Sequence, residues 1–360
     1  MSNKNPTCFV NVLGISQADV DVECGTQAWT RRAHEQETGQ AAPRDDGPSK
    51  RFSAIIVHRN GADMLMNTLR ALSHAVDAQR DEIIVVDNGS CDDSLAALRT
   101  WFPQITLAAN GCNNGFARAC NQGMRLARGR FLLLLNNDAV VPADLFTVLE
   151  AHFHAHPRLG LLGVQLVDET GRPHCSHGSL PCFTDAFDFK WRRRHQVRTN
   201  QRLDYLIVDA VVGACMATSR EALDAVGLLD EEFFFYFEET EWSHRMRRLG
   251  WEVAVAQDTK VVHASGVSTR GLRKEAELEM FHSRLVFNRK IFSRPQACLL
   301  NSYWLLRLTV NVLANMLVTL ATLGFSARAR AKFGVYSYLF AWQLCGRPRR
   351  WGLPDKCKKI

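Results

Sequence analysis

Several signals that would assign the chain to a common class are missing from its 360 residues. The first twenty residues contain no basic segment followed by a long apolar run, so they predict no secretory signal. The 11 cysteines include no Cys-x-x-Cys pair, and the stretch CNNGFARAC lacks metal-ligand spacing. Neither a Gly-x-Ser-x-Gly elbow nor a Walker-type phosphate loop occurs. These absences favour free thiols in a reducing compartment, and therefore a cytoplasmic protein.

What is present is an ordinary globular composition, 46% hydrophobic and 22% charged, with a formal net charge of +7. The positive excess is concentrated near the C-terminus, where Asp355 is the one acid after Ala327. The bases there are Arg328, Arg330, Lys332, Arg347, Arg349, Arg350, Lys356, Lys358 and Lys359. Such a tail can meet anionic lipid, nucleic acid or a diphosphate-bearing substrate. We expect a membrane surface or a diphosphate and not nucleic acid, and a solvated tail without a partner is the alternative.

Hydrophobic patterning predicts the organisation of the chain. Residues 1–50 show no sustained period and end in GQAAPRDDGPSK, which predicts a poorly ordered leader. From Arg51 onward the runs SAIIVH, EIIVVDN, ITLAA and FLLLL predict strands that alternate with amphipathic helices. This order implies right-handed βαβ units and a Rossmann-like, mostly parallel sheet flanked by helices, that is, an α/β fold. We expect a nucleotide-binding half over 51–141 and an acceptor half over 142–292.

The later part of the chain predicts mixed structure followed by a helical, basic extension over 293–360. Thr218 with Glu221 forms a capping-box pattern, and EVAVAQDTKVVH predicts two short strands. No charged residue occurs from Leu308 to Phe325, which is near the lower length limit for a membrane span. We expect this segment to lie at a bilayer surface beside the basic tail, and a buried helical hairpin is the alternative.

Four polar clusters follow strands of the predicted sheet: Asn60 with Gly61, Asp87 with its NGS, NGCNNGFARACNQG, and NND at 136–138. Ligands of open parallel sheets bind outside the carboxyl ends of the strands, so these clusters predict one cleft. Asp87 can accept hydrogen bonds from a base or ribose, or can serve only as a turn residue. Arg118, near a helix start, can face a phosphate or be an ordinary surface arginine.

The stretch FLLLLNNDAVV raises the question of why a core strand ends in two amides and a carboxylate. A carboxylate at the open end of a strand can bind a divalent cation that also binds a diphosphate. Asp138 is therefore the candidate ligand for Mg²⁺ or Mn²⁺. Asn136, on the same strand face, can reach a ribose hydroxyl or a metal-bound water.

A second constellation is FFFYFEETEW, in which an aromatic run leads into Glu238, Glu239 and Glu241. A charged first helical turn explains these acids without any function. The apolar surround should nevertheless raise the pKa of a carboxylate, which suits a general base, and Tyr236 and Trp242 can form a wall for a sugar ring. His263, which ends the strand KVVH, is either a metal ligand or a strand-end histidine.

Taken together, these residues resemble the family 2 glycosyltransferases with their GT-A fold, and within them the bacterial rhamnosyltransferase-like branch that builds cell-surface polysaccharides. The resemblance runs from Ser53 to about Phe292. It rests on five stretches in order, SAIIVHRNG, EIIVVDNGSCDDS, NNGFARACNQGMRLARGRFLLLLNND, GLLDEEFFFYFEETEW and VVHASGVS. Five such stretches at the right spacing are far more specific than any one of them.

The resemblance implies roles for individual residues. Asp138, with Asn136, would replace the Asp-x-Asp of the family and bind the cation, with His263 as a further ligand. Glu239 stands where the family usually has an aspartate as the catalytic base, so Glu238 or Glu241 is an alternative base. The donor nucleotide would contact Asn60, Asp87, Asn114, Gly115, Arg118, Asn121 and Asn136.

The implied reaction is inverting transfer from a nucleotide-diphosphate sugar, with dTDP-rhamnose favoured. The acceptor would be a lipid-linked sugar or a polysaccharide at the cytoplasmic face of the membrane, with KWRRRHQVR near its diphosphate. Two other classes stay open. A sugar nucleotidyltransferase should carry a Gly-rich signature at the first strand, which SAIIVHRNG lacks. A non-catalytic, membrane-associated nucleotide-sugar-binding protein would keep its nucleotide affinity yet tolerate loss of Glu239, and the glutamates that stand where the family usually has aspartate keep this class open.

Overall fold

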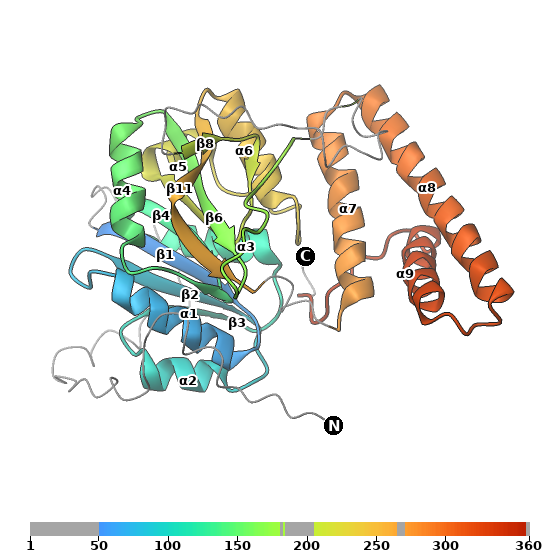
Figure 1. Cartoon of the computed structure of the whole chain (residues 1–360), viewed down its shortest axis with the longest axis horizontal. Coiled ribbons are helices and arrows are strands. Elements are labelled where there is room, and N and C mark those ends of the chain that lie inside the picture. Colours follow the sequence, from blue (N-terminus) through green and yellow to red (C-terminus); the bar gives the residue numbers. More distant parts are fainter. Residues whose placement is uncertain (1–49, 181–182, 184–204, 265–270, 358–360) are drawn as a thin grey trace.

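The structure is a computed structural model that describes residues 50–180, 183, 205–264 and 271–357. The leader predicted for residues 1–50 lies outside the described residues except for its last one, and so does the stretch KWRRRHQVR. Two bodies are visible in Figure 1: an α/β body and, beside it, a helical layer formed by the C-terminal part of the chain.

One mixed sheet forms the centre of the α/β body. Its strand order is β3-β2-β1-β4-β10-β6-β11-β5, and β8 also pairs with β11. The first four neighbours are parallel, β10 is antiparallel to both β4 and β6, and β11 is parallel to β6. The strands are β1 Lys50–His58, β2 Glu82–Asn88, β3 Thr106–Asn110, β4 Gly129–Asn136, β5 Ala139–Val140, β6 Leu159–Val167, β8 Tyr205–Ile207, β10 Cys215–Ser219 and β11 Glu252–His263, with a separate pair β7 His177–Gly178 and β9 Ala210–Val211.

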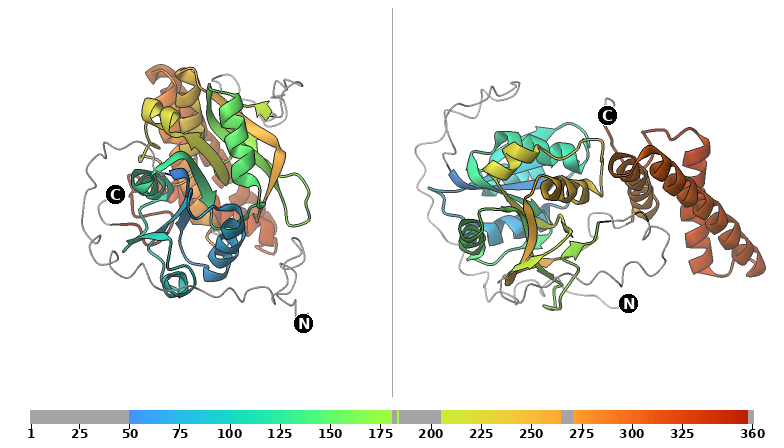
Figure 2. Two further views of the ribbon diagram at one scale, coloured as in Figure 1. Left: turned by 90° about the vertical axis from the view of Figure 1, so that its left-hand side faces the viewer. Right: turned by 90° about the horizontal axis from the view of Figure 1, so that it is seen from above.

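Helices cover both faces of this sheet, as Figures 1 and 2 show. One face packs against α1 (Ala62–Ala75), α2 (Ser94–Trp101) and α4 (Leu145–Ala155). The other packs against α3 (Phe116–Leu126), α5 (Arg220–Val226) and α6 (Glu238–Arg248). Because both faces are covered, the central residues of β1, β2 and β4 are apolar and buried. The predicted α/β fold with a sheet flanked by helices is confirmed; the pairings of β3, β2, β1 and β4 are parallel, and the sheet as a whole is mixed.

Three helices follow the sheet: α7 (Arg273–Ile291), α8 (Arg294–Ala321) and α9 (Ala327–Leu344). Figure 2 shows α8 and α9 standing away from the α/β body. Within the described residues, α8 is the one helix long and apolar enough to cross a membrane, with a mean hydropathy of 1.5 in its most apolar window. Its buried residues are Ala297, Leu300 and Leu308, so it is not the buried hairpin considered as the alternative. An exposed apolar helix is compatible with a membrane-associating extension.

Two local predictions are wrong. The capping position of α5 is Ser219, whose Oγ accepts a hydrogen bond from the N–H of Ala222. Thr218 instead lies in β10 and donates to the carbonyl of Gly160, because strand pairing extends one residue further than the capping pattern suggests. EVAVAQDTKVVH forms one strand, β11, with an irregularity between Ala256 and Lys260, where two separate strands were expected.

The segment after α9 returns to the α/β body. The backbone of Asn113 pairs with the C-terminal segment, since its N–H donates to Asp355 and its carbonyl accepts from Cys357. A disulfide joins Cys112 to Cys357 across 245 residues. The prediction of free thiols is therefore wrong for this pair, because no sequence spacing shows which distant cysteines the fold brings together. Six further cysteines of the described residues are free.

Candidate functional site

The loops after β1 and β2 are joined by side-chain hydrogen bonds. Asn60 accepts from the N–H of Cys91 at 2.8 Å, and the hydroxyl of Ser90 lies 2.9 Å from the backbone nitrogen of Asn60. Asn60 has a positive φ of 57°, a conformation that asparagine tolerates better than most residues. Its amide therefore fixes the shape of the sheet edge, and a contact with the donor nucleotide stays a prediction.

Asp87 is fully buried at the end of β2. Its Oδ2 accepts hydrogen bonds from Gly89 and Ser90, which is the turn role considered from the sequence. Its Oδ1 is buried and has no hydrogen-bond partner in the described part of the chain, and a contact of Asp87 with the nucleotide stays a prediction. Neighbouring strand residues point to opposite faces, and it is Asn88 that lines the pocket at this edge.

That pocket opens between the carboxyl ends of the parallel strands and the aromatic segment before α6. It is lined by Val57, His58, Arg59, Asn88, Asn113, Gly115, Phe116, Asn136, Asn137, Phe234, Phe235, Leu272 and Leu353. Asn88 and Asn113 were not among the predicted site residues; their amides are joined by a 2.9 Å hydrogen bond and fix the loop before α3. Leu353, which the C-terminal segment brings to the pocket wall, was not predicted either. A buried amide pair following two adjacent strands was the available signal for the asparagines.

Gly115 allows the aromatic segment to approach the start of α3. Its φ is 84°, and a Cβ at this position would lie 2.7 Å from the carbonyl oxygen of Phe234. The next N–H, of Phe116, donates to that same carbonyl at 2.7 Å. The backbone N–H of Asn114 donates to Asn88. Both predicted residues thus belong to the pocket loop, Gly115 through its missing side chain and Asn114 through its backbone.

Arg118 and Asn121, by contrast, hold the loop before the aromatic run. Arg118 Nε donates to Glu231 at 3.1 Å. Asn121 is fully buried and exchanges hydrogen bonds with the backbone of Leu229 while also donating to Glu231. The prediction that Asn121 contacts the nucleotide is wrong, because its amide is used up inside the protein. Arg118 does not line the pocket.

Asp138, Asn136 and His263 come together where β4 ends and β11 ends. Asp138 Oδ1 lies 3.3 Å from Nε2 of His263, and the same nitrogen lies 3.3 Å from the amide of Asn136. Asp138 Oδ1 is buried and has no partner with hydrogen-bond geometry within the described chain. A buried carboxylate oxygen without a donor suits a cation. The described residues hold no group of three His, Cys, Asp or Glu side chains able to bind a metal.

The acidic cluster begins α6 after two strained residues. Tyr236 and Phe237 both have φ of 72°, an uncommon conformation for aromatic residues. Such strain is kept only where the surrounding structure enforces it, and it gathers at functional sites. Here the two left-handed residues turn the chain so that the next three residues start a helix at the edge of the sheet.

The three glutamates of the cluster have different surroundings. Glu238 is buried, and its charge interacts electrostatically with Cys120 in α3. Burial, and to a smaller extent the charge of Glu239, raise the pKa of Glu238 well above the usual range. Glu241 is buried and accepts from Arg245 at 2.8 Å, and that arginine also donates to the carbonyls of Val226 and Leu228. Glu241 is therefore held in a structural ion pair, which argues against its being the base.

Glu239 is the half-buried member of the cluster, and burial raises its pKa. It lies beside Gly213, where an added Cβ would be 3.7 Å from Cγ of Glu239. The carbonyl of the next residue, Ala214, accepts from the N–H of Asn136 at 2.9 Å. Glu239 and the backbone of Asn136 thus lie beside two consecutive residues, Gly213 and Ala214. The roles of Glu239 as the base and of Asp138 as the cation ligand stay predictions.

One predicted wall residue does not face the site. Trp242 is fully buried in the core between α6 and the sheet, and its indole N–H donates to the carbonyl of Gly227. It is a core residue because it is four positions from buried Met246 on the inner face of α6. Tyr236 remains partly exposed, with its ring 4.4 Å from that of Phe235.

Comparison with known proteins agrees with this arrangement. Residues 53–227 match the family model described as Glycosyl transferase family 2. The sheet covered by helices on both faces and this match indicate a glycosyltransferase of the GT-A class, which uses a nucleotide sugar. The chain carries a family 2 glycosyltransferase domain, and the predicted resemblance to rhamnosyltransferases is confirmed by its relatives.

Three curated relatives illustrate the range of similarity. Low-salt glycan biosynthesis hexosyltransferase Agl10 of Haloferax volcanii is 24% identical over 265 residues, 68% of this chain and 77% of the relative. N-acetylglucosaminyl-diphospho-decaprenol L-rhamnosyltransferase of Mycobacterium tuberculosis is 26% identical over 208 residues, which cover 52% of this chain and 67% of the relative. dTDP-rhamnosyl transferase RfbF of Shigella flexneri is 25% identical over 219 residues, which cover 59% of this chain and 69% of the relative.

Proposed function

We propose that the protein transfers a sugar, rhamnose being favoured, from a nucleotide-diphosphate donor to a lipid-linked or polysaccharide acceptor, with inversion at the anomeric carbon. The observation that carries the proposal is that Glu239 lies beside Gly213, while the next residue, Ala214, accepts a hydrogen bond from the backbone of Asn136, two residues before Asp138. A single displacement needs one base on the acceptor side and charge stabilisation on the leaving-group side. This arrangement supplies both within one site.

In the proposed mechanism, the donor nucleotide lies in the pocket formed by Asn88, Asn113, Phe116 and the aromatic segment. Glu239 accepts the proton of the acceptor hydroxyl as that oxygen attacks the anomeric carbon. The bond from this carbon to the donor diphosphate breaks, and the nucleoside diphosphate leaves with the electron pair. Tyr236 bounds the sugar, and Phe234 and Phe235 exclude water, which would otherwise compete as an acceptor.

Asp138, with His263 and Asn136 beside it, would hold Mg²⁺ or Mn²⁺ at the end of β4. When bound, the cation offsets the negative charge that develops on the departing diphosphate. The buried Oδ1 of Asp138, which lies 3.3 Å from Nε2 of His263 and has no hydrogen-bond donor in the described part of the chain, supports this assignment. Asn136 in place of a second carboxylate leaves room for substrate oxygens among the ligands.

The location and domain organisation also remain proposals. Residues 51–141 would bind the nucleotide, residues 142–292 the acceptor, and residues 293–360 would bring the enzyme to the cytoplasmic face of the membrane. The exposed apolar residues of α8 support membrane attachment, since a water-soluble helix seldom presents such a continuous apolar surface. A rhamnosyltransferase acting on a diphospho-decaprenol sugar is among the relatives, which supports a lipid-linked acceptor.

The test is transfer of label from a panel of nucleotide sugars into lipid extracts and polysaccharide, with and without Mn²⁺. Glu239→Gln keeps the size of the side chain but removes the base, so we expect the rate to fall by about 10²–10⁴-fold. Glu169→Gln, at an exposed position outside the site, is the matched control and should match the wild type. Full activity of Glu239→Gln would reassign the base, and nucleotide binding without transfer by the wild type would favour the non-catalytic alternative.

A further inference from the structure

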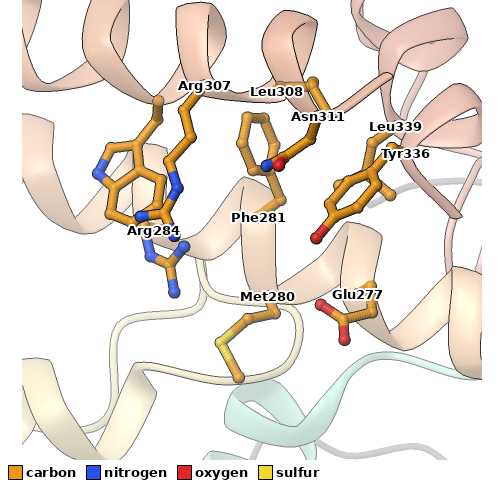
Figure 3. A pocket seen from close by; sticks show the side chains of 10 residues that line it. Glu277, Met280, Phe281, Arg284, Arg307, Leu308, Asn311, Tyr336 and Leu339 are labelled. Carbon is orange, nitrogen blue, oxygen red and sulfur yellow. The ribbon is translucent and has the colours of Figure 1, made fainter. Parts of the chain in front are cut away.

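One buried histidine of the site has no part in the proposed mechanism. His58 is the last residue of β1, is fully buried, and belongs to the wall of the donor pocket, the pocket that holds Asn88 and Asn113. A pocket between α7, α8 and α9, which Figure 3 shows, shares no lining residue with the donor pocket and is separate from this site. A buried polar ring is costly unless it is hydrogen-bonded, so the partners of His58 indicate what it does.

The first partner of His58 lies in the turn that carries the candidate cation ligand. Asn137 and Asp138 are the two residues of the turn between β4 and β5. Turns usually lie at the surface, but Asn137 is only 7% exposed. Its side-chain nitrogen lies 2.8 Å from Nδ1 of His58, and its carbonyl accepts a hydrogen bond from Oγ1 of Thr68 at 2.9 Å. The peptide bond that leads into Asp138 is therefore held from inside the protein.

The other side of Asp138 is held by β11. The carbonyl of Asp138 accepts from the N–H of Ala264 at 3.4 Å, and Ala139 is opposite His263 in the pairing of β5 with β11. Asp138 thus lies between two fixed neighbours, and the direction of its carboxylate depends on both. Loss of the support at Asn137 should loosen the turn on the side away from β11, and the carboxylate with it.

The available hydrogens decide the direction of each bond around His58. Nε2 of His58 lies 2.8 Å from Oγ of Ser94, the first residue of α2. Burial raises the pKa of Asp92, but hydrogen bonds from Ser94 and Gly61 outweigh burial and bring that pKa below its usual value, so this carboxylate is an acceptor. Ser94 donates its one hydroxyl hydrogen to Asp92 and can then only accept from His58. Nε2 therefore carries the hydrogen of the ring.

A neutral imidazole with its hydrogen on Nε2 leaves Nδ1 as an acceptor, and the amide of Asn137 is its donor. Burial lowers the pKa of His58 more than the charges of Asp87 and Asp92 raise it, which favours the neutral ring. The bonds therefore run in one direction, from Asn137 through His58 to the start of α2. They connect the turn after β4 to the loop after β2.

We propose that His58 is a positioning residue for the cation site: by accepting from Asn137, it fixes the turn that presents Asp138. The fold supplies this support before any ligand binds, so the carboxylate is already oriented when the cation arrives. Groups that hold a metal ligand in place typically change metal affinity about ten- to a hundredfold when they are removed. The inference rests on the proposed function, since the cation belongs to that same reaction.

Two substitutions separate the two sides of the ring. The side-chain oxygen of His58→Asn can take the position of Nδ1 and accept from Asn137, whereas the side-chain nitrogen of His58→Gln can take that of Nε2 and donate to Ser94. Titration of Mn²⁺ into the full-length protein saturated with dTDP measures the Kd of the cation. We expect His58→Gln to bind Mn²⁺ about ten- to a hundredfold more weakly than the wild type, and His58→Asn to stay close to it.

A double variant and a control complete the test. Asn137→Ala removes the donor and should weaken Mn²⁺ binding by itself, and adding His58→Gln should then change the Kd no further, because the two residues act through one hydrogen bond. His152→Gln is the matched control, since His152 is a buried histidine that contacts Asp258 and does not line the donor pocket. It should lower the Tm without ligand, as both His58 variants should, and leave the Kd of Mn²⁺ unchanged.

Equal effects of His58→Asn and His58→Gln on the Kd of Mn²⁺ would overturn the inference, because a merely structural histidine does not distinguish the two nitrogens. Additive losses in the double variant, or a wild type that binds no Mn²⁺, would overturn it as well. So would normal Mn²⁺ affinity in Asn137→Ala, a result that does not depend on the folding of the His58 variants. A wild type that transfers no sugar from any donor, while the Mn²⁺ affinities divide as expected, would instead contradict the proposed function itself.

Discussion

Oδ1 of Asp138 lies 3.3 Å from Nε2 of His263, although the two residues are far apart in the chain. The pairing of β11 with β5 brings them together, because His263 is opposite Ala139, the residue after Asp138. The carboxylate keeps one buried oxygen without a hydrogen-bond donor in the described chain. In the described part of the chain this oxygen, Oδ1, faces Nε2 of His263, which is charged only when protonated, and we predict that it also accepts a bound cation.

The first prediction concerns that oxygen. Mn²⁺ together with a nucleoside diphosphate should raise the Tm of the wild type, since a ligand at about 100 times its Kd stabilises by about 2.7 kcal/mol. Asp138→Asn should lose the part of the rise that depends on Mn²⁺ while keeping a similar Tm without ligand. Thermal-shift curves with and without the cation measure both quantities. An unchanged Mn²⁺ effect in Asp138→Asn would show that the cation binds elsewhere.

The second prediction is a pH dependence. Burial raises the pKa of Glu239 above its ordinary value of 4.5, and only the ionised form can accept a proton. The kcat/KM of the wild type should therefore fall as the pH drops through this raised value, with its acidic limb above pH 4.5. Glu239→Gln should show low activity and no such limb. A limb at or below 4.5 would mean that an unperturbed carboxyl controls the rate.

The third prediction concerns the stability of the buried neighbour, Glu238. Its raised pKa means that the folded state keeps a proton which the unfolded chain releases above about pH 4.5. The free energy of unfolding of the wild type should therefore decrease as pH rises from 4.5 towards the folded-state pKa. Glu238→Gln, which has no such titration, should gain relative stability over this range, about 1.4 kcal/mol for each unit of pKa shift.

Denaturant unfolding of both proteins at several pH values measures this difference. The two should be similar near pH 4.5 and diverge towards neutrality, with the variant the more stable. A wild type that is more stable than Glu238→Gln at pH 7 would mean that the carboxylate is ionised and paired in the folded state.

The fold was predictable because β1, β2 and β4 are apolar runs that end in polar clusters, and this pattern depends on local sequence. The sequence did not predict which residue of a polar cluster faces the pocket. Asp87 and Asn88 are adjacent and point to opposite faces, and only the packing of α3 shows that the pocket is on the side of Asn88. Trp242 was misplaced for a similar reason, since an aromatic residue beside acids can lie in the core. The donor pocket wall at Leu353 depends on a contact across most of the chain.

That long-range contact gives the last prediction. The Cys112–Cys357 disulfide closes a segment of 245 residues, and a disulfide across a long loop typically stabilises by about 2–4 kcal/mol. Cys357→Ser should lower the free energy of unfolding by this amount, and reducing agent should bring the wild type to the same level. Cys345→Ser, at an exposed free cysteine close to the same terminus, is the control: it should keep the stability of the wild type and lose the same amount of stability under reducing agent.

Loss of this disulfide should also affect the donor pocket more than the acceptor side. The segment that ends at Cys357 carries Leu353 to the pocket wall and pairs with the backbone of Asn113, whose amide fixes Asn88. Loosening the segment should therefore raise KM for the nucleotide sugar several-fold, while KM for the acceptor changes little. Equal changes in both constants would mean that the C-terminal segment stabilises the whole domain and has no particular role at the nucleotide.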